Sequence, residues 1–267
     1  MRISMGYAVC LLVQVVGAKK NLRAVVNNDL DVSSVESIKS PSKIEKAKSF
    51  DFYVLSMSYQ PEFCHMKRKF SYAGCEKPQD FWRKNLTIHG MWPEDEDGSW
   101  PSNCSNEKFN PQTVDDLGED RFYHFWPDVK LNPKHSLEYT FYEHEWEKHG
   151  TCTGLSQDDY FDTALRHFLP TPEVVHENYG SSIPKDTLLS TYRDENYDEV
   201  GDVVLVCSGG KYLSEVRICV AKSRADNSGS KRIKCIHEVE DEGSCGEVVH
   251  IAKFYVDEEE VVELKEK

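Results

Sequence analysis

Cysteine usage limits what this chain can fold into more than any other feature. The 267 residues include nine cysteines, and no two of them form a Cys-x-x-Cys pair, so a zinc ribbon or a thiol redox motif has little support. One of them, Cys10, lies in an apolar segment near the N-terminus. The other eight are an even number, which is typical of a disulfide-bonded domain in an oxidising compartment, and about 105 pairings stay open.

The N-terminal segment has the pattern of a secretory signal peptide. Arg2 precedes an apolar stretch at residues 8–16, and residues 16–18 read Val-Gly-Ala, a small-residue cleavage site. The stretch is short for a membrane-spanning helix. We predict a signal peptide at residues 1–18 whose removal takes Cys10 with it. The mature protein would enter the secretory pathway without a membrane span and end outside the cell, in a vacuole or in a lysosome.

The rest of the chain divides into three parts by composition. Residues 19–49 are polar and rich in serine, which predicts a linker or pro-segment. Residues 50–256 mix strand-forming and helical segments without a regular β-α-β order, which favours a single α+β domain. Residues 257–267 hold six acidic and two basic side chains and predict a solvated acidic tail.

Local patterns predict the elements of that domain. Apolar residues between 160 and 169, spaced by one, three and four, predict a helix face that Pro170 ends. The polar segment 223–230 fits the connection of a hairpin. Strand-forming residues predict strands at 50–59, 86–91, 203–206, 211–220, 233–236 and 252–256.

The charge balance excludes one class of function. Asp and Glu number 46 against 32 Lys and Arg, which gives a formal net charge of −14. A protein that holds DNA or RNA by a broad positive field needs the opposite balance, so we expect no stable DNA binding. A small cationic site stays possible, and protonation of all ten histidines would move the net charge from −14 to −4.

The first candidate motif follows the predicted strand at 86–91. A Gly-x-Trp-Pro turn begins at Gly90 and leaves His89 near the end of the strand. Strand alternation puts His89 on the face opposite both Ile88 and Gly90. A single histidine at such a place is more often structural than catalytic, so this motif needs a partner elsewhere in the chain.

The second candidate motif spans residues 142–152, where six of eleven side chains are ionisable. If residues 138–149 are helical, a rotation of about 100° per residue places four functional groups on one side. Two histidines, a lysine and a carboxylate crowded together cost free energy unless they face an anion. These four groups belong to His144, Glu145, Lys148 and His149.

The same segment departs from the zinc-protease helix His-Glu-x-x-His. The fourth position after His144 is Lys148, whose cation repels a metal, and His149 is rotated away. We therefore predict no metal ligand and no cofactor. Three histidines, a lysine and a glutamate can cleave RNA without a metal. A base takes the 2′-hydroxyl proton, an acid protonates the departing 5′-oxygen, and cations stabilise the phosphate.

Both motifs resemble the active-site segments of the ribonuclease T2 family, the secreted acid ribonucleases. The family patterns are His-Gly-Leu-Trp-Pro and His-Glu-Trp-x-Lys-His-Gly-Thr-Cys. Residues 89–93 depart from the first only by methionine for leucine, and residues 144–152 match the second in full. Residues 59–64, Tyr-Gln-Pro-Glu-Phe-Cys, are similar to the family's Trp-Gln-Pro-x-x-Cys. The resemblance covers residues 50–256 and implies a disulfide-stapled α+β fold with a central, mainly antiparallel sheet flanked by helices.

The resemblance also implies roles for the site residues. His149 would be the general base and His89 the general acid in the transfer step, and the roles would reverse when water opens the 2′,3′-cyclic phosphate. Glu145 and Lys148 would stabilise the pentacoordinate phosphate, with His144 helping to bind it.

Further expectations concern the surroundings of this site. Trp92 would support the base pocket, with core packing as an equal alternative, and packing is favoured for Trp146. Asn85 and Asn103 begin glycosylation sequons, which agree with secretion. The disulfides implied by the resemblance are Cys64–Cys75, Cys104–Cys152, Cys207–Cys245 and Cys219–Cys235.

Three functions remain in competition. The first is a secreted, monomeric, metal-independent endoribonuclease that cuts single-stranded RNA and leaves 2′,3′-cyclic phosphate and then 3′-phosphate ends. The second is a secreted cysteine-rich binding or signalling protein with lost or secondary ribonuclease activity, which would bind a partner tightly without cleaving RNA. The third is a metal-dependent hydrolase, which a chelator would inactivate. The base preference stays open.

Overall fold

The computed structural model describes residues 49–66, 72–131, 139–194 and 203–254, all within one compact unit. The predicted signal peptide at 1–18 and acidic tail at 257–267 lie outside these residues, as does the predicted linker at 19–49 except for its last residue. Within the described part of the chain, no helix is both long and apolar enough to cross a membrane.

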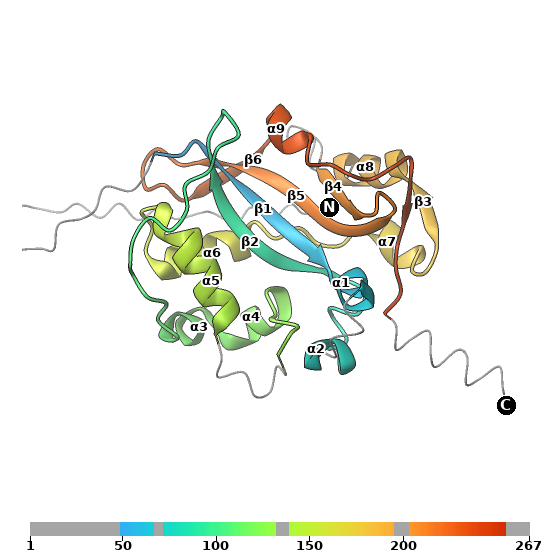
Figure 1. Ribbon diagram of the computed structural model, residues 1–267, viewed down its shortest axis with the longest axis horizontal. Helices are drawn as coiled ribbons and strands as arrows, with labels where there is room; N and C mark the ends of the chain where they lie inside the picture. Colours follow the sequence, from blue (N-terminus) through green and yellow to red (C-terminus); the bar gives the residue numbers. More distant parts are fainter. Residues whose placement is uncertain (1–48, 67–71, 132–138, 195–202, 255–267) are drawn as a thin grey trace, which may run out of the picture. The chain divides into compact units, whose positions relative to one another are not determined.

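A seven-stranded sheet forms the centre of the domain (Figure 1). Strand β1 (Phe52–Tyr59) lies between β2 (Leu86–Glu94) and β5 (Tyr212–Lys222) and is antiparallel to both. Strand β5 is also antiparallel to β4 (Val204–Ser208) and to β6 (Gly229–Ile233). The predicted hairpin connection after residue 222 therefore joins β5 to β6.

Two short strands extend the sheet beyond β5. Strand β7 (Val248–His250) meets β5 in parallel, with Tyr212 opposite His250. Strand β3 (Ser182–Pro184) is antiparallel to β7. Because all the other described pairings are antiparallel, the predicted α+β fold with a mainly antiparallel sheet is confirmed.

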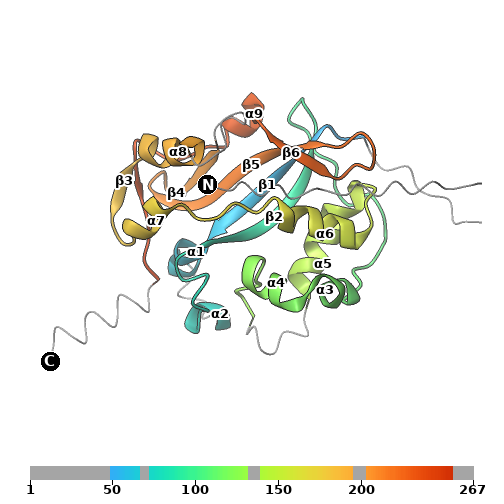
Figure 2. The ribbon, with the colours of Figure 1, turned by 180° about the vertical axis from the view of Figure 1, so that it is seen from behind.

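Helices flank this sheet in two groups. The described helices are α1 (Gln60–Met66), α2 (Ala73–Glu76), α3 (Gln112–Leu117), α4 (Glu119–Phe125), α5 (Thr140–Lys148), α6 (Gln157–Arg166), α7 (Glu173–Glu177), α8 (Lys185–Asp194) and α9 (His237–Glu240), with a 3₁₀ turn, η2, at Gly150–Cys152. Figures 1 and 2 both show α3 to α6 gathered beside β2, and α7 and α8 near β3. The first group brings α5, the predicted catalytic helix, next to the strand that carries the first motif.

Aromatic side chains fill the space between β2 and α4 to α6. Two of them donate hydrogen bonds to the backbone of β2: Trp126 Nε1 to the carbonyl of His89 at 3.0 Å, and the Tyr160 hydroxyl to the carbonyl of Met91 at 2.8 Å. Buried polar groups of this kind must find partners, so these bonds fix the position of β2 against the helices. The fully buried aromatic residues in this region are Phe122, Trp126, Trp146, Tyr160 and Phe161.

The helix predicted at 160–169 has the expected length but begins and ends three residues earlier in the structure. Helix α6 begins after Ser156, whose hydroxyl accepts a hydrogen bond from the Asp159 N–H, and it ends at Arg166. Leu169 is buried all the same, and its N–H contacts the Met57 sulfur. The apolar pattern continued past the helix because the following loop packs on the same core.

Two predicted strands are wrong for a similar reason. Of residues 233–236, only Ile233 belongs to β6, and Cys235 is buried in a disulfide rather than in a ladder. Within the strand predicted at 252–256, residues 252–254 belong to no strand and residues 255–256 lie outside the described part of the chain. The last described strand is β7. Phe254 packs with Trp82 and the Cys64–Cys75 disulfide, so an apolar residue is needed here even though the segment is not a strand.

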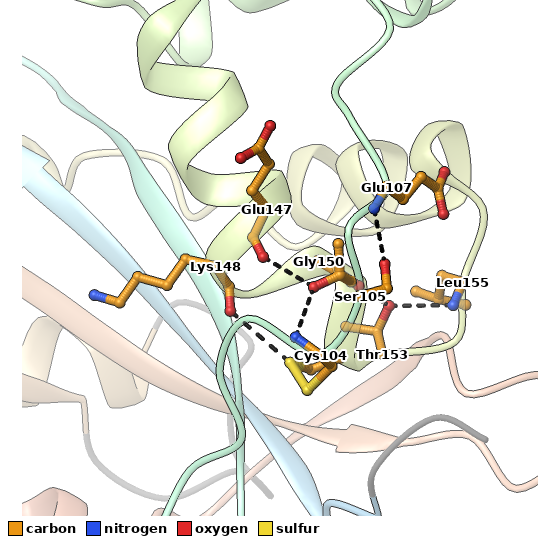
Figure 3. Close-up of a disulfide and its surroundings, with 10 residues drawn as sticks. Cys104, Ser105, Glu107, Glu147, Lys148, Gly150, Thr153 and Leu155 are labelled. Carbon is orange, nitrogen blue, oxygen red and sulfur yellow. Dashed lines mark hydrogen bonds between the residues drawn. A yellow bond between two sulfur atoms is a disulfide. The ribbon is translucent and has the colours of Figure 1, made fainter. Parts of the chain in front are cut away.

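Four disulfides join the cysteines in the pairs that the resemblance implied. They are Cys64–Cys75, Cys104–Cys152, Cys207–Cys245 and Cys219–Cys235. Figure 3 shows the second of these beside the end of α5. The Asn103 N–H donates to the carbonyl of Lys148 at 2.8 Å, and the Cys104 N–H donates to the Thr151 hydroxyl at 3.2 Å. The loop after β2 is thus tied to the end of the catalytic helix.

We predict that the Cys104→Ala/Cys152→Ala double variant is strongly destabilised. This disulfide closes a loop of 48 residues, which corresponds to about 4 kcal/mol of unfolding free energy in the chain-entropy account. The control is Cys64→Ala/Cys75→Ala, whose loop of 11 residues corresponds to about 3 kcal/mol. Thermal unfolding followed by circular dichroism should show a larger loss of Tm for the first pair. Equal Tm values for wild type and the first variant would contradict the assignment.

A second prediction concerns stability and pH. Glu62 on α1 is only 1% exposed, and burial raises its pKa to about 7. The protonated form of this buried carboxyl contributes fully to the free energy of unfolding below the ordinary pKa of glutamate. The contribution is lost as pH rises through the raised pKa of the folded protein. Urea unfolding measured from pH 4 to pH 8 should show that the free energy of unfolding of wild type falls by up to about 3 kcal/mol relative to that of Glu62→Gln. Parallel curves for these two proteins would refute this, and the exposed Glu107→Gln should behave as wild type.

Candidate active site

Strand β2 and helix α5 bring the two motifs to one hollow of about 310 Å³. The strand supplies the first motif, and the last turns of α5 with the residue after it supply the second. The structure therefore places together all six of the predicted catalytic and substrate-binding residues. They are His89, Trp92, His144, Glu145, Lys148 and His149.

The predicted rotation of the catalytic helix is confirmed. Helix α5 spans Thr140–Lys148. Its His144, Glu145 and Lys148 line the hollow together with His149, the residue that follows the helix. Glu147 points elsewhere and forms an ion pair with Lys108 at 2.9 Å. Trp146 is buried in the core, so the packing interpretation holds for this indole.

A bulge in β2 sets the direction of His89. Gly90 pairs with Ser56 of β1, and Ile88 pairs with the next residue, Met57, so His89 is an extra residue without a partner in the ladder. Ser56 and Met57 point to opposite faces, and so do their partners. The expectation that Ile88 and Gly90 share a face is therefore wrong. Ordinary alternation fails here because the bulge inserts one residue.

The Glu145 carboxyl of α5 lies against Gly90 of β2. Its side chain is buried, and Oε2 accepts a hydrogen bond from Trp92 Nε1 at 3.1 Å. A Cβ atom at position 90 would lie 2.1 Å from that oxygen, so any larger residue would displace the carboxyl from this position. Burial raises the pKa of Glu145 to about 7, against the opposing effects of His89 and the Trp92 bond. In mildly acidic solution this carboxyl is protonated.

His149 is held in its neutral form. It is buried next to the Trp92 ring, with ring centroids 5.6 Å apart. Burial lowers its pKa to about 3, and the nearby cations Lys148, His144 and His89 add to the effect. The pKa of His144 is lowered by burial and by Lys148 in the same way. A neutral imidazole at position 149 can accept a proton at mildly acidic pH.

His89 has the opposite electrostatic environment. Its Nδ1 lies 2.7 Å from Oε1 of Glu215, and 38% of its side chain is exposed. Burial lowers the pKa of His89, but the hydrogen bond and the negative charge of Glu215 outweigh burial and raise the pKa overall. His89 and His149 therefore favour opposite protonation states, which is the arrangement that paired acid and base catalysis needs.

The sequence interpretation missed several residues of this site. Arg217 of β5, Glu242 and the exposed Trp100 of the loop after β2 line the hollow. Glu215 of β5 lies beside it and pairs with both His89 and Arg217. The sequence did hold a signal for Glu215 and Arg217. They are two charged residues at alternate positions of an otherwise apolar predicted strand, and such residues share one face. An isolated tryptophan in a polar loop offered none.

The two sequon asparagines differ in their surroundings. Asn85 is half-buried, its Nδ2 donates to the carbonyl of Phe81 at 2.8 Å, and its Oδ1 lies 3.0 Å from His176 Nε2. Asn103 is exposed and has a left-handed φ of 51°. Glycosylation of either residue stays a prediction. Among the residues that the structure describes, no group of three or more His, Cys, Asp and Glu side chains is arranged to hold a metal ion.

Comparison with known proteins identifies the family of this chain. The model of the Ribonuclease T2 family matches residues 50–235. Ribonuclease 1 of Arabidopsis thaliana is 33% identical over 223 residues, which are 80% of this chain and 91% of that protein. Ribonuclease T2 of Sus scrofa is 41% identical over 109 residues, 39% of this chain and 46% of that protein.

Solved structures show the same fold. Ribonuclease MC1 from bitter gourd seeds matches with a TM-score of 0.52 and 21% identity over 75% of this chain and all of its own. The S3-RNase of Japanese pear matches with a TM-score of 0.56 and 24% identity over 76% of this chain and all of its own. The match of the family model over most of the chain, together with these relatives, shows that the protein belongs to the ribonuclease T2 family.

Proposed function

We propose that this protein is a secreted, metal-independent endoribonuclease that cleaves single-stranded RNA by transfer to the substrate's own 2′-hydroxyl. The observation that carries the proposal is the pair of imidazoles in one hollow whose surroundings shift their pKa values in opposite directions. Membership of the T2 family supports the endoribonuclease activity. Four disulfides and the predicted signal peptide support the secretory route.

The transfer step follows from the two protonation states. Neutral His149 removes the proton of the 2′-hydroxyl, and the oxygen attacks the adjacent phosphorus. The bond from phosphorus to the 5′-oxygen breaks, and protonated His89 gives its proton to that oxygen. The products are a 2′,3′-cyclic phosphate and a free 5′-hydroxyl. Because each histidine now holds the opposite state, His89 can activate water and His149 can protonate the 2′-oxygen as the ring opens to a 3′-phosphate.

The remaining groups of α5 stabilise the charge on the phosphate. Lys148 and, when protonated, His144 supply positive charge beside it. Glu145, with a pKa of about 7, carries a proton in mildly acidic solution and donates a hydrogen bond to a phosphate oxygen instead of repelling it. This need for a neutral carboxyl favours activity on the acid side of neutrality.

Trp100 supports a preference for unpaired bases. It lines the hollow with 58% of its surface exposed, whereas Arg217 lies over the ring of Trp92, the other indole of the hollow. Aromatic faces bind unpaired bases by stacking, which is worth about 1–3 kcal/mol per base and tolerates different sequences. Bases in a duplex are stacked on their neighbours, so single-stranded RNA fits this surface better.

We predict that His89→Ala and His149→Ala each lose roughly 10²- to 10⁴-fold of kcat/KM, because each removes one proton-transfer group. The assay is hydrolysis of single-stranded RNA in excess EDTA, with the 2′,3′-cyclic ends quantified by mass spectrometry. His237→Ala is the matched control, since this exposed imidazole pairs with Asp241 and does not line the hollow. Full activity in either of the first two variants, with unchanged circular dichroism, would refute its assignment.

The pH profile of kcat/KM should be bell-shaped. Activity should rise with pH through the pKa of His149, about 3, because the base must be neutral. It should fall at higher pH as His89 and Glu145, whose pKa values are both raised, lose their protons. Glu145→Gln keeps a hydrogen-bond donor, so at pH 5 it should exceed Glu145→Ala by roughly tenfold or more. A rate that climbs steadily to pH 9 would contradict these protonation states.

A further inference from the structure

We propose that Glu215 is a positioning residue for the general acid. From β5, on the other side of β1, it fixes the orientation and tautomer of His89 on β2. This inference rests on the proposed function for its catalytic consequence. The contact itself is a property of the folded protein and can be tested separately.

The contact determines which imidazole nitrogen is free. Nδ1 of His89 lies 2.7 Å from Oε1 of Glu215. An ionised carboxylate only accepts hydrogen bonds, so Nδ1 must carry the hydrogen and donate it. Nε2 is then the nitrogen that exchanges its proton with substrate, and this assignment holds in both the neutral and the protonated ring.

The sheet is built so that the two side chains can meet across β1. His89 is on β2 and Glu215 on β5, and β1 runs between these strands. Ser58 of β1 pairs with Glu215, and Ser56 pairs with Arg217, so these four residues share one face. The two serines carry small side chains, which leave space above β1 for the imidazole. The bulge at His89 turns its ring toward this face.

Arg217 holds the Glu215 carboxylate in place and in its charged form. Its Nε and Nη2 both donate to Oε2 of Glu215, at 3.0 and 2.7 Å, which leaves Oε1 for His89. Arg217 also pairs with Glu242 and lies over the Trp92 ring, 5.4 Å from the centroid. Burial raises the pKa of Glu215, but His89 and Arg217 outweigh it and lower the pKa to about 2.

The other charged groups around His89 do not replace this carboxylate. Glu145 of α5 attracts the imidazolium, but its own pKa of about 7 leaves it neutral in mildly acidic solution. Arg217 of β5 opposes the charge on His89, and His144 and His149 also interact unfavourably with it. Among the described residues that act on His89, Glu215 is therefore the carboxylate whose charge persists through the acid range.

The test compares Glu215→Gln with wild type by NMR of ¹³C,¹⁵N-histidine-labelled protein, with His89→Ala used to assign the resonance. Glu215→Gln keeps the shape and an acceptor oxygen but removes the charge. We expect the pKa of His89 to fall and its neutral ring to become a mixture of tautomers. An unchanged pKa and an unmixed tautomer would overturn the proposal. This readout does not require the protein to cleave RNA, so inactivity of wild type would refute the proposed function while leaving the positioning contact to be judged by NMR.

Kinetics then separate positioning from substrate binding. Glu215→Gln should lower the pH at which kcat/KM begins to fall on the alkaline side, and Glu215→Ala should lose roughly 10- to 100-fold of kcat with KM within about twofold. Glu147→Gln is the matched control, because it removes a carboxylate of α5 that pairs with Lys108 on the far side. A loss confined to KM, or an equal shift in Glu147→Gln, would overturn the proposal.

Discussion

The close approach of α5 to β2 at Gly90 is the constraint on which the rest of this site depends. The Glu145 carboxyl occupies the space that a side chain at position 90 would fill. Hydrogen bonds from Trp126 and Tyr160 hold β2 at this distance. The two halves of the site, which are more than 50 residues apart in sequence, are brought together by this packing and by the hydrogen bond from Trp92 to Glu145.

This packing gives two identical side chains different chemistry. His149 lies among buried apolar surface and other cations, so it resists protonation, whereas His89 lies beside a carboxylate and favours it. The formal net charge of −14 therefore says little about the hollow, where positive groups gather around Lys148. Overall negative charge opposes tight binding of nucleic acid. It is compatible with an enzyme that must release its product.

The sequence predicted the parts of this site that depend on local geometry. Helical rotation alone grouped the four residues of α5, since spacing within one helix fixes direction. The bulge at His89 depends on the register of β2 against β1, and Glu215 is 126 residues away from its partner. Neither can be derived from a local pattern. The strand predicted at 252–256 failed for a related reason, because Phe254 is apolar through tertiary packing, and an apolar run does not distinguish a buried strand from a buried loop.

The central claim is that the nucleophile belongs to the substrate. A DNA oligonucleotide with a single internal ribonucleotide tests it directly, in excess EDTA at mildly acidic pH. We expect one cut, on the 3′ side of the ribonucleotide, with a 2′,3′-cyclic phosphate as the first product detected by mass spectrometry. The matched oligonucleotide with a 2′-O-methyl group at that position should stay intact. Cleavage of the methylated oligonucleotide at a similar rate, or cuts elsewhere in the DNA, would contradict the account.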